Sequence, residues 1–402
     1  MRKRLAVLLP VALGLTLGAA PAGAVATAGG ARTWRCSTVS PLVKPFKVGE
    51  FFEVSSQSAA RDARIVAFAS GQQLLPDHPL PQGTFASLVY VKDRRTGRLE
   101  AVGDRQGVAP LAMEPQLSAD GRWLEWINQN VIYLEDRATR KVTTLARGQE
   151  ARMLDTVGLS ENGRYSAFAT NMGALTGDPT LQEHVVVLDR LTGRRSVVPL
   201  PKPSGPPQGS ALPNNPTLST DGRHVAYTTA PPGNDQVQHA YIYDLSSRVL
   251  RDATAGSPDT NVQRVSLSRT GRYIAYETWA TSSPNPGSLP QINFRDLRRR
   301  TTTFVSVLPK GAHLSAAAVP SISESARYVM FNADGGVYVR DLKRRATSFI
   351  SPPSPLPDGW SMFGYPLSGD GRHALLTIGF SARFSSTSFP YVADANRSCR
   401  HR

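Results

Sequence analysis

The sequence predicts an all-β fold, a seven-bladed β-propeller of four-stranded antiparallel blades. A turn motif of the form L-S-x-D-G-R recurs seven times, and an apolar strand ending in Asp follows each copy. Successive copies are 42 to 59 residues apart, a spacing typical of propellers and solenoids. Helical periodicity is nearly absent, whereas the 33 Gly and 31 Pro residues gather at turns, as an all-β chain requires.

Each repeat begins with a strand that ends in the turn motif. The copies read AARDAR (59–64), LSADGR (117–122), LSENGR (159–164), LSTDGR (218–223), LSRTGR (267–272), ISESAR (322–327) and LSGDGR (367–372). The second strand follows at once, and its fourth residue is aromatic in six copies: Phe68, Trp126, Phe168, Tyr227, Tyr276 and Phe331. Its third residue is usually Ala, so both faces are apolar, which predicts a strand buried between two neighbouring blades.

The third strand of every repeat ends in an aspartate. These residues are Asp93, Asp136, Asp189, Asp244, Asp296, Asp341 and Asp394, and further aspartates stand within the turn motifs at Asp120, Asp221 and Asp370. A ring of acidic or metal sites is one interpretation. We favour a structural role, because Asp at a strand end accepts hydrogen bonds from its own turn. A fourth strand follows in most copies, for instance at 142–146 and 196–200.

The seventh repeat has three strands, and only eight residues follow Asp394. We expect residues 33–39 to add the fourth strand of the last blade, which would close the ring and remove an exposed edge. This pairing would bring Cys36 near Cys399, the two cysteines of the chain. In an oxidising compartment they are expected to form a disulfide, the alternative being two free thiols.

The N-terminus has the pattern of a secretory signal peptide. Three basic residues precede an apolar run from Leu5 to about Gly18, and Ala22-Gly23-Ala24 fits a cleavage site. The alternative, a membrane anchor, would need a run of about 20 apolar residues. We therefore expect a signal peptide at 1–24, an N-terminal segment at 25–56 and the propeller at 57–402. The mature protein is expected to be secreted, in the cell envelope or outside it, and not to span a membrane.

The two faces of the predicted propeller differ in sequence. One face carries short turns rich in arginine, and the formal net charge of +15 suits an anionic partner, unless arginine simply solubilises the surface. The other face carries long variable loops, and function tends to lie on such loops. Our binding hypothesis therefore falls on aromatic residues of the loop face, unless these loops are tolerated insertions: Trp279, Trp360, Phe363, Phe380 and Phe384. The basic face is the rival, with an anionic polymer as ligand. No aromatic residues interleave its turns, so we expect no nucleic acid.

The repeat, an L-S-x-D-G-R turn followed by an apolar strand with an aromatic residue and a strand ending in Asp, resembles the TolB-type, WD-like propeller repeat over residues 57–395. The resemblance implies a propeller. TolB proteins carry six blades after an α/β domain, whereas this chain has seven repeats and only residues 25–56 before them. Peptidases of the prolyl-oligopeptidase type use similar propellers, but no G-x-S-x-G nucleophile motif is present here.

The sequence contains no Walker loop, no H-E-x-x-H and no C-x-x-C motif. We therefore predict a monomeric, non-enzymatic binding scaffold without cofactor or metal, whose partner is a protein or a cell-envelope polymer. The alternative is a lyase-like, carbohydrate-active enzyme for acidic oligosaccharides, because some seven-bladed propellers with similar repeats are such lyases and hold a metal by histidines. Candidate ligands on the loop face would be His78, His184, His239 and His313.

Overall fold

The computed structural model describes twelve ranges of the 402 residues. They are 37–43, 54–80, 86–102, 111–148, 154–177, 183–201, 214–230, 237–256, 260–280, 289–308, 311–382 and 385–395. All of them belong to one compact unit, Arg32–Arg402.

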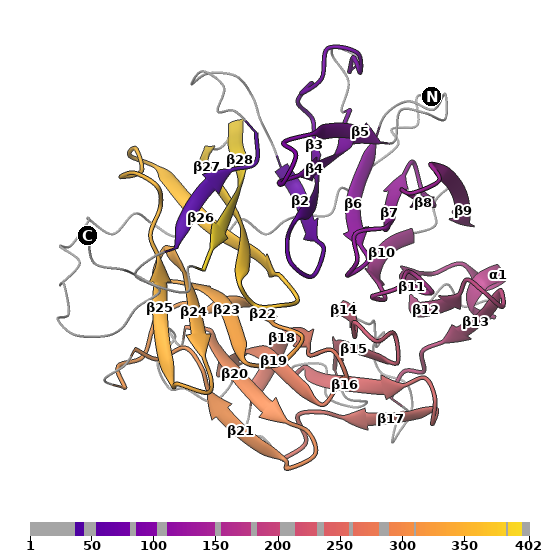
Figure 1. The fold of residues 1–402 in the computed structure, drawn as a ribbon. Helices are drawn as coiled ribbons and strands as arrows, with labels where there is room; N and C mark the ends of the chain where they lie inside the picture. Colours follow the sequence, from indigo (N-terminus) through magenta and orange to yellow (C-terminus); the bar gives the residue numbers. More distant parts are fainter. Residues whose placement is uncertain are drawn as a thin grey trace, which may run out of the picture. The chain divides into compact units, whose positions relative to one another are not determined.

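Seven four-stranded antiparallel sheets stand around a common axis (Figure 1), which confirms the predicted seven-bladed propeller. Blade 1 consists of β2 (Val54–Ala59), β3 (Ile65–Ser70), β4 (Leu88–Asp93) and β5 (Leu99–Val102), and blade 2 of β6 (Ala112–Leu117), β7 (Trp123–Asn128), β8 (Val131–Asp136) and β9 (Lys141–Arg147). Blade 3 consists of β10 (Leu154–Leu159), β11 (Tyr165–Thr170), β12 (His184–Asp189) and β13 (Arg194–Val197), and blade 4 of β14 (Asn214–Leu218), β15 (His224–Thr229), β16 (His239–Asp244) and β17 (Val249–Asp252). Blades 5 to 7 are β18 (Thr260–Leu267), β19 (Tyr273–Ala280), β20 (Gln291–Asp296), β21 (Thr301–Phe304); β22 (Ala318–Ile322), β23 (Tyr328–Ala333), β24 (Gly336–Asp341), β25 (Ala346–Ile350); and β26 (Trp360–Leu367), β27 (His373–Ala382), β28 (Ser385–Asp394), β1 (Thr38–Pro41).

The last blade joins both ends of the ring. Strand β1 pairs antiparallel with β28, with Thr38 opposite Asp394 and Pro41 opposite Tyr391. The observed strand shares Thr38 and Val39 with the predicted segment 33–39, of which residues 33–36 lie outside the described residues. Cys36 and Cys399 lie outside the described residues, so their disulfide stays a prediction.

The first strand of each blade lies innermost, and each contacts the next around the axis, with β26 against β2. Every one of these seven strands carries a register shift in its pairing with the second strand. A bulge adds one unpaired residue and bends the strand there. Three residues at these bulges have positive φ: Glu114, Asn215 and Val319. The bulges therefore interrupt the regular alternation of side chains close to the axis.

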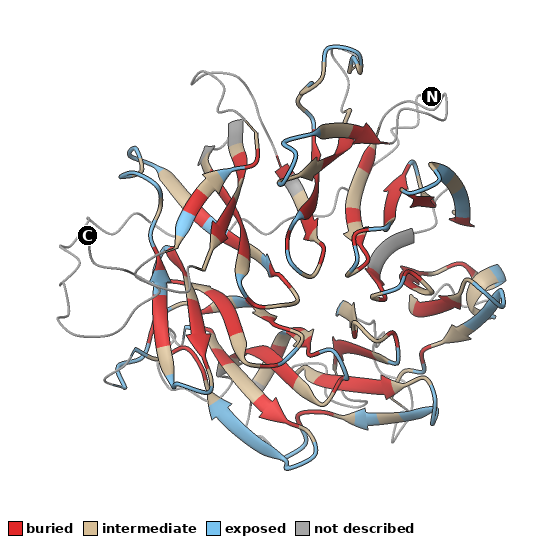
Figure 2. Ribbon diagram, in the orientation of Figure 1, coloured by how far each residue is buried: buried red, intermediate tan, exposed pale blue. Residues whose placement is uncertain are grey.

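The core lies between neighbouring blades (Figure 2). All six aromatic residues at the fourth position of the second strands are at most 1% exposed. Several stack on an aromatic residue of the third strand, such as Phe68 on Tyr90 with ring centroids 5.7 Å apart and Phe331 on Tyr338 at 5.9 Å. The pattern arises because a strand covered on both faces must be apolar on both.

The described helix is the single turn α1 (Gly173–Thr176). Within the described ranges, no helix has the length and apolar character needed to cross a membrane.

Candidate functional site

At the face of the short turns, seven backbone hydrogen bonds link the turn motifs into a closed ring. Each joins the amide of one turn to a carbonyl of the next, at 2.7–3.1 Å: Arg61 to Ala119, Ala119 to Glu161, Glu161 to Thr220, Asp221 to Arg269, Arg269 to Glu324, Glu324 to Gly369 and Asp370 to Arg61. We call this end of the axis the turn end, and the opposite end, from which the long loops depart, the loop end.

Four charged side chains meet over the turn end, and we call them the axial cluster: Arg61, Glu161, Arg269 and Glu324. Arg61 binds Glu161 at 2.7 Å and Glu324 at 2.8 Å, and Arg269 binds Glu161 at 2.7 Å. Each ion pair skips one blade. The skipped blades carry short residues at the equivalent position: Ala119, Thr220 and Gly369. The cluster therefore spans the axis above short side chains, with two positive and two negative charges.

The third-strand aspartates form ion pairs with arginines, in addition to accepting hydrogen bonds from the amides of their own turns. Five pair with the arginine of the turn motif: Arg64–Asp93, Arg122–Asp136, Arg164–Asp189, Arg272–Asp296 and Arg327–Asp341. The paired arginine lowers the pKa of Asp136 and of Asp189 to about 2. In the two remaining blades, Asp244 lies 3.7 Å from His224, and Asp394 contacts His373 and Arg94. The sequence analysis missed these partners.

The aspartates of the turn motif make local contacts too. Asp120, Asp221 and Asp370 each accept a hydrogen bond from the serine hydroxyl two residues earlier, at 2.5–2.7 Å. Each also accepts the amide of the arginine two residues later. These carboxylates therefore take part in the turns, in the manner expected of such residues.

The loop-side aromatic residues of the binding hypothesis fall into two groups. Trp360 and Phe363 lie on β26, and Phe380 lies opposite Trp360 on β27. Trp360 stacks in parallel on Phe389, with centroids 6.1 Å apart, whereas the side chain of Phe363 is 55% exposed. Trp279 belongs to blade 5, on β19. Phe384 lies outside the described residues.

Trp279 belongs to a polar constellation that the sequence analysis missed. Glu277 Oε1 accepts the Trp279 indole N–H at 3.0 Å, and its Oε2 accepts Arg264 Nη1 at 3.3 Å and the Val319 amide at 3.1 Å. The Glu277 carboxylate is 3% exposed, whereas the side chain of Arg264 is 47% exposed. A buried carboxylate thus holds an arginine whose remaining donors reach solvent. The available signal was a charged pair, Arg264 and Glu277, in strands that are otherwise apolar or neutral.

The side chains exposed on the innermost strands β14, β18, β22 and β26 include Asn215, Arg264, Val319 and Phe363. One edge of each strand is hydrogen-bonded, and both faces are covered by neighbouring blades. The solvent that these residues meet is therefore on the axis side. We call these four residues the axial surface. An amide, a guanidinium, an aliphatic side chain and an aromatic ring together can contact both the polar groups and the apolar face of a sugar.

Three of the four histidines proposed as metal ligands have separate neighbours, and the fourth, His184, is the first residue of β12. His239 contacts Asp252 at 2.7 Å, His78 lies 3.5 Å from Asp77, and His313 packs on Phe304. In the ranges that the structure covers, no group of three or more His, Cys, Asp or Glu side chains stands close enough to hold a metal ion. This set of donor side chains does not fit a metal ion.

No protein-family profile and no curated protein sequence matches the chain. Similar solved structures include an oligogalacturonate lyase from Vibrio parahaemolyticus, with a TM-score of 0.57 and 12% identity, covering 89% of this chain and 94% of that one. An oligogalacturonate lyase in complex with manganese has a TM-score of 0.57 and 14% identity, covering 90% and 94%. A TolB structure from Agrobacterium tumefaciens has a TM-score of 0.47 and 17% identity, covering 77% and 99%.

These similarities establish the fold and correct one prediction. The sequence analysis predicted a protein that is not an enzyme, because it found no known catalytic motif. That prediction is contradicted by the lyase structures, which cover nearly the whole of this chain. A propeller assembles its site from strands and loops of different blades, so a short contiguous motif is a poor guide to activity. The chain is a seven-bladed β-propeller whose fold is similar to that of two oligogalacturonate lyase structures over 89% and 90% of its length.

Proposed function

We propose that this protein is a carbohydrate-active, lyase-like enzyme that acts on acidic oligosaccharides at the axial surface, reached from the loop end. The observation that carries the proposal is the Arg264 guanidinium, exposed on an innermost strand and held there by the buried Glu277 carboxylate. Glu277 takes one of the five N–H donors of Arg264, so the others are available to a ligand.

A uronic acid residue offers the partner that such an arginine prefers. Guanidinium and carboxylate groups form two parallel hydrogen bonds, which fix the orientation of the ligand as well as its position. In a β-elimination, a base takes the proton from the carbon next to the carboxylate, a C=C bond forms and the glycosidic C–O bond breaks, so that the leaving sugar keeps the oxygen; negative charge develops on the carboxylate as the proton leaves. A cation held at that carboxylate stabilises the developing charge. Arg264 would thus bind the substrate, while Glu277 would act as its positioning residue.

Phe363 supplies the apolar part of the site. Its ring is 55% exposed on β26, between the buried residues Met362 and Gly364. The C–H face of a pyranose can cover such a ring. The lyase structures of the same architecture are named for oligogalacturonate, an oligomer of an acidic sugar, which supports this choice of substrate class.

The test uses trigalacturonate, with its carboxyl-reduced neutral analogue as the ligand control. Binding is measured by calorimetry, and turnover by the ultraviolet absorbance of an unsaturated product. Arg264→Gln should weaken trigalacturonate binding about tenfold or more, since a charged hydrogen bond contributes about 1.5–3 kcal/mol. Arg95→Gln, which removes an exposed arginine of blade 1, is the matched control.

The proposal is wrong if the wild-type protein neither binds nor cleaves trigalacturonate. Equal binding of the neutral analogue, or an unchanged affinity in Arg264→Gln, would remove Arg264 from the site.

A further inference from the structure

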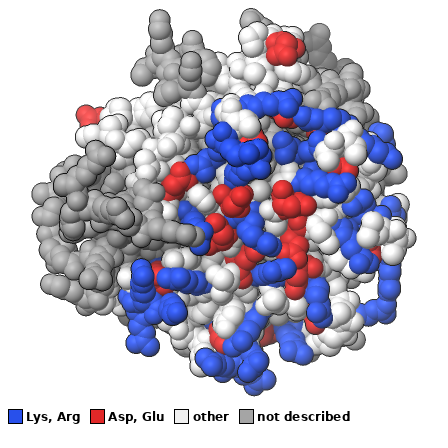
Figure 3. Space-filling model, viewed as in Figure 1, with Lys and Arg blue, Asp and Glu red and all other residues white. Residues whose placement is uncertain are grey.

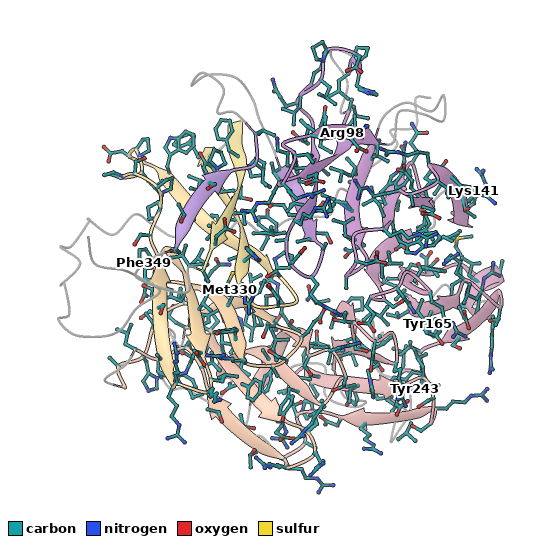
Figure 4. The ribbon with its side chains drawn as sticks, in the orientation of Figure 1. Arg98, Lys141, Tyr165, Tyr243, Met330 and Phe349 are labelled. Carbon is teal, nitrogen blue, oxygen red and sulfur yellow. The ribbon has the colours of Figure 1, made fainter. Side chains whose placement is uncertain are left out.

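The turn end carries two classes of arginine, which differ in whether a carboxylate of the chain pairs with them. Those of the turn motif are neutralised, because five of them pair with a third-strand aspartate. Four of these also stack on the aromatic residue that follows them, at 4.7–5.1 Å from the ring centroid, as Arg164 does on Tyr165. Tyr165 is labelled in Figure 4. These arginines serve the fold.

The second class occupies the turns between third and fourth strands and the ends of these strands. On blades 3 to 6 it comprises ten exposed cations, which we call the basic rim: Arg194, Arg195, Arg248, Arg251, Arg298, Arg299, Arg300, Lys343, Arg344 and Arg345. Only Arg299 and Arg344 have a carboxylate partner in the described ranges, the aspartate of their own turn at 4.0 and 3.9 Å. Figure 3 shows Lys and Arg side chains spread around the margin of this face, with acidic side chains nearer its centre. The rim therefore has a large uncompensated positive charge.

Backbone geometry gives an independent sign that these cations matter. The fourth residue after the third-strand aspartate adopts positive φ in six blades, and it is glycine in blades 1 and 3, Gly97 and Gly193. In blades 4, 5 and 6 the same position is Arg248, Arg300 and Arg345, with φ of 57°, 56° and 53°. The left-handed conformation is less favourable for a residue with a side chain than for glycine. Three arginines thus occupy a position that glycine would fill at lower cost.

Blade 2 provides an internal comparison. Arg140 also stands at this left-handed position, but it contacts Glu100 at 2.6 Å and Glu135 at 3.3 Å. The neighbouring Arg137 lies 3.9 Å from Glu100. In this blade, two ion pairs stabilise the arginine in its left-handed backbone conformation. Arg248, Arg300 and Arg345 have no carboxylate partner among the described residues, and their exposed guanidinium groups can take one from a ligand.

We propose that the basic rim is a docking surface for an extended acidic polysaccharide, distinct from the axial surface. Ten cations on four consecutive blades match a polymer with a carboxylate on every sugar, because each guanidinium can take a carboxylate. The choice of a polysaccharide rests on the proposed function, for the rim would hold the polymer whose short fragments enter the axial surface. Single-stranded nucleic acid fits less well, because it binds on aromatic stacking platforms, which these turns do not offer.

The experiment exploits the glycine position. The triple variant Arg248→Gly, Arg300→Gly, Arg345→Gly removes three charges and should keep or raise the unfolding temperature. Its affinity for long-chain polygalacturonate should fall about tenfold or more, since these are charge contacts between exposed groups. The control, Arg95→Gln, Arg98→Gln, Lys141→Gln, makes the same change in net charge on blades 1 and 2, from which Arg98 and Lys141 are labelled in Figure 4. This control should retain polymer binding.

Duplex DNA and vesicles containing phosphatidylglycerol are assayed at the same salt concentration. Unchanged polygalacturonate binding in the glycine variant, or equal loss in the control, would overturn the rim as a defined surface. Tighter binding of DNA or vesicles than of polygalacturonate would overturn the polysaccharide as its partner. The two proposals fail separately: Arg264→Gln should lose trigalacturonate and keep polygalacturonate binding, whereas the glycine variant should do the reverse.

Discussion

The two ends of the propeller axis are built from the same seven strands and differ in how their side chains are used. At the turn end, the repeated motif supplies a backbone ring, arginine–aspartate pairs and a charge-balanced axial cluster. Further along the axis, the same strands expose Arg264 and Phe363, which depart from the repeat. The comparison teaches that the charged side chains of the turn end neutralise one another, both in the repeated Arg–Asp pairs and in the axial cluster, whereas Arg264 and Phe363 keep hydrogen-bond donors and apolar surface exposed.

The turn end also shows why the motif pairs glycine with an aromatic residue. The turn glycine of one blade lies against the first residue of the second strand in the preceding blade. A Cβ on Gly163 would lie 2.3 Å from Trp123 Cγ, and one on Gly222 would lie 2.5 Å from Tyr165 Cδ2. Glycine therefore permits both the left-handed turn and close packing between blades.

At the turn end, a large effect on stability is expected from Gly163→Ala. The new methyl group would collide with Trp123, and φ at this residue is +67°. Strain and overpacking together should lower the free energy of unfolding by about 2–4 kcal/mol. Urea denaturation measures this loss. The matched control is Ala326→Gly, because Ala326 already has φ of 55° in the degenerate turn of blade 6. It should change stability by less than about 1 kcal/mol. Equal effects in both variants would show that blade packing does not select this glycine.

A second test addresses the body of the propeller between the two ends. Glu125 is fully buried on β7, where four other blades have alanine. Burial raises its pKa from 4.5 to about 8, against the smaller opposing effect of the Ser166 hydroxyl. The folded state thus keeps the proton and the unfolded state releases it above pH 4.5, so stability falls as pH rises from 4.5 to 8.

Glu125→Gln keeps the shape and removes this dependence. The variant should exceed the wild type in free energy of unfolding at pH 8 by about 1–3 kcal/mol, and the advantage should vanish towards pH 5. Denaturation at both pH values measures it. The control Glu135→Gln removes a buried carboxylate that is paired with Arg140, and it should destabilise the protein at pH 8. A pH-independent difference for Glu125→Gln would mean that this carboxyl is ionised in the folded protein.

The smallest effect on stability is expected at the loop end. Phe363→Ala removes a ring that is 55% exposed, so the free energy of unfolding should change by no more than about 1 kcal/mol. Trigalacturonate affinity should nevertheless fall several-fold if the ring contacts the sugar. Phe331→Ala, which removes a buried ring of blade 6, is the contrasting variant and should cost about 3–5 kcal/mol. A large loss of stability in Phe363→Ala would show that this ring packs in the core, which would contradict the difference between the two ends that is described above.

The sequence by itself determined the blades. Seven turn motifs and seven strand-ending aspartates predicted the ring, because each blade is a local meander whose hydrogen bonds join neighbouring segments of chain. The sequence also pointed to Phe363, through an aromatic residue near a variable loop. It did not reveal Arg264 and Glu277, since their importance depends on which of them is buried and which faces the axis.

Only the tertiary structure decided which distant residues meet. Arg61 pairs with Glu161 and Glu324 from blades that are far apart in the chain, and no local pattern encodes that encounter. It likewise separated the arginines into those neutralised by aspartate and those of the basic rim, although both sets stand in similar turns. The physical reason is the closure of the ring, which brings seven equivalent positions together around one axis and lets their differences in charge and size determine which side chains pair.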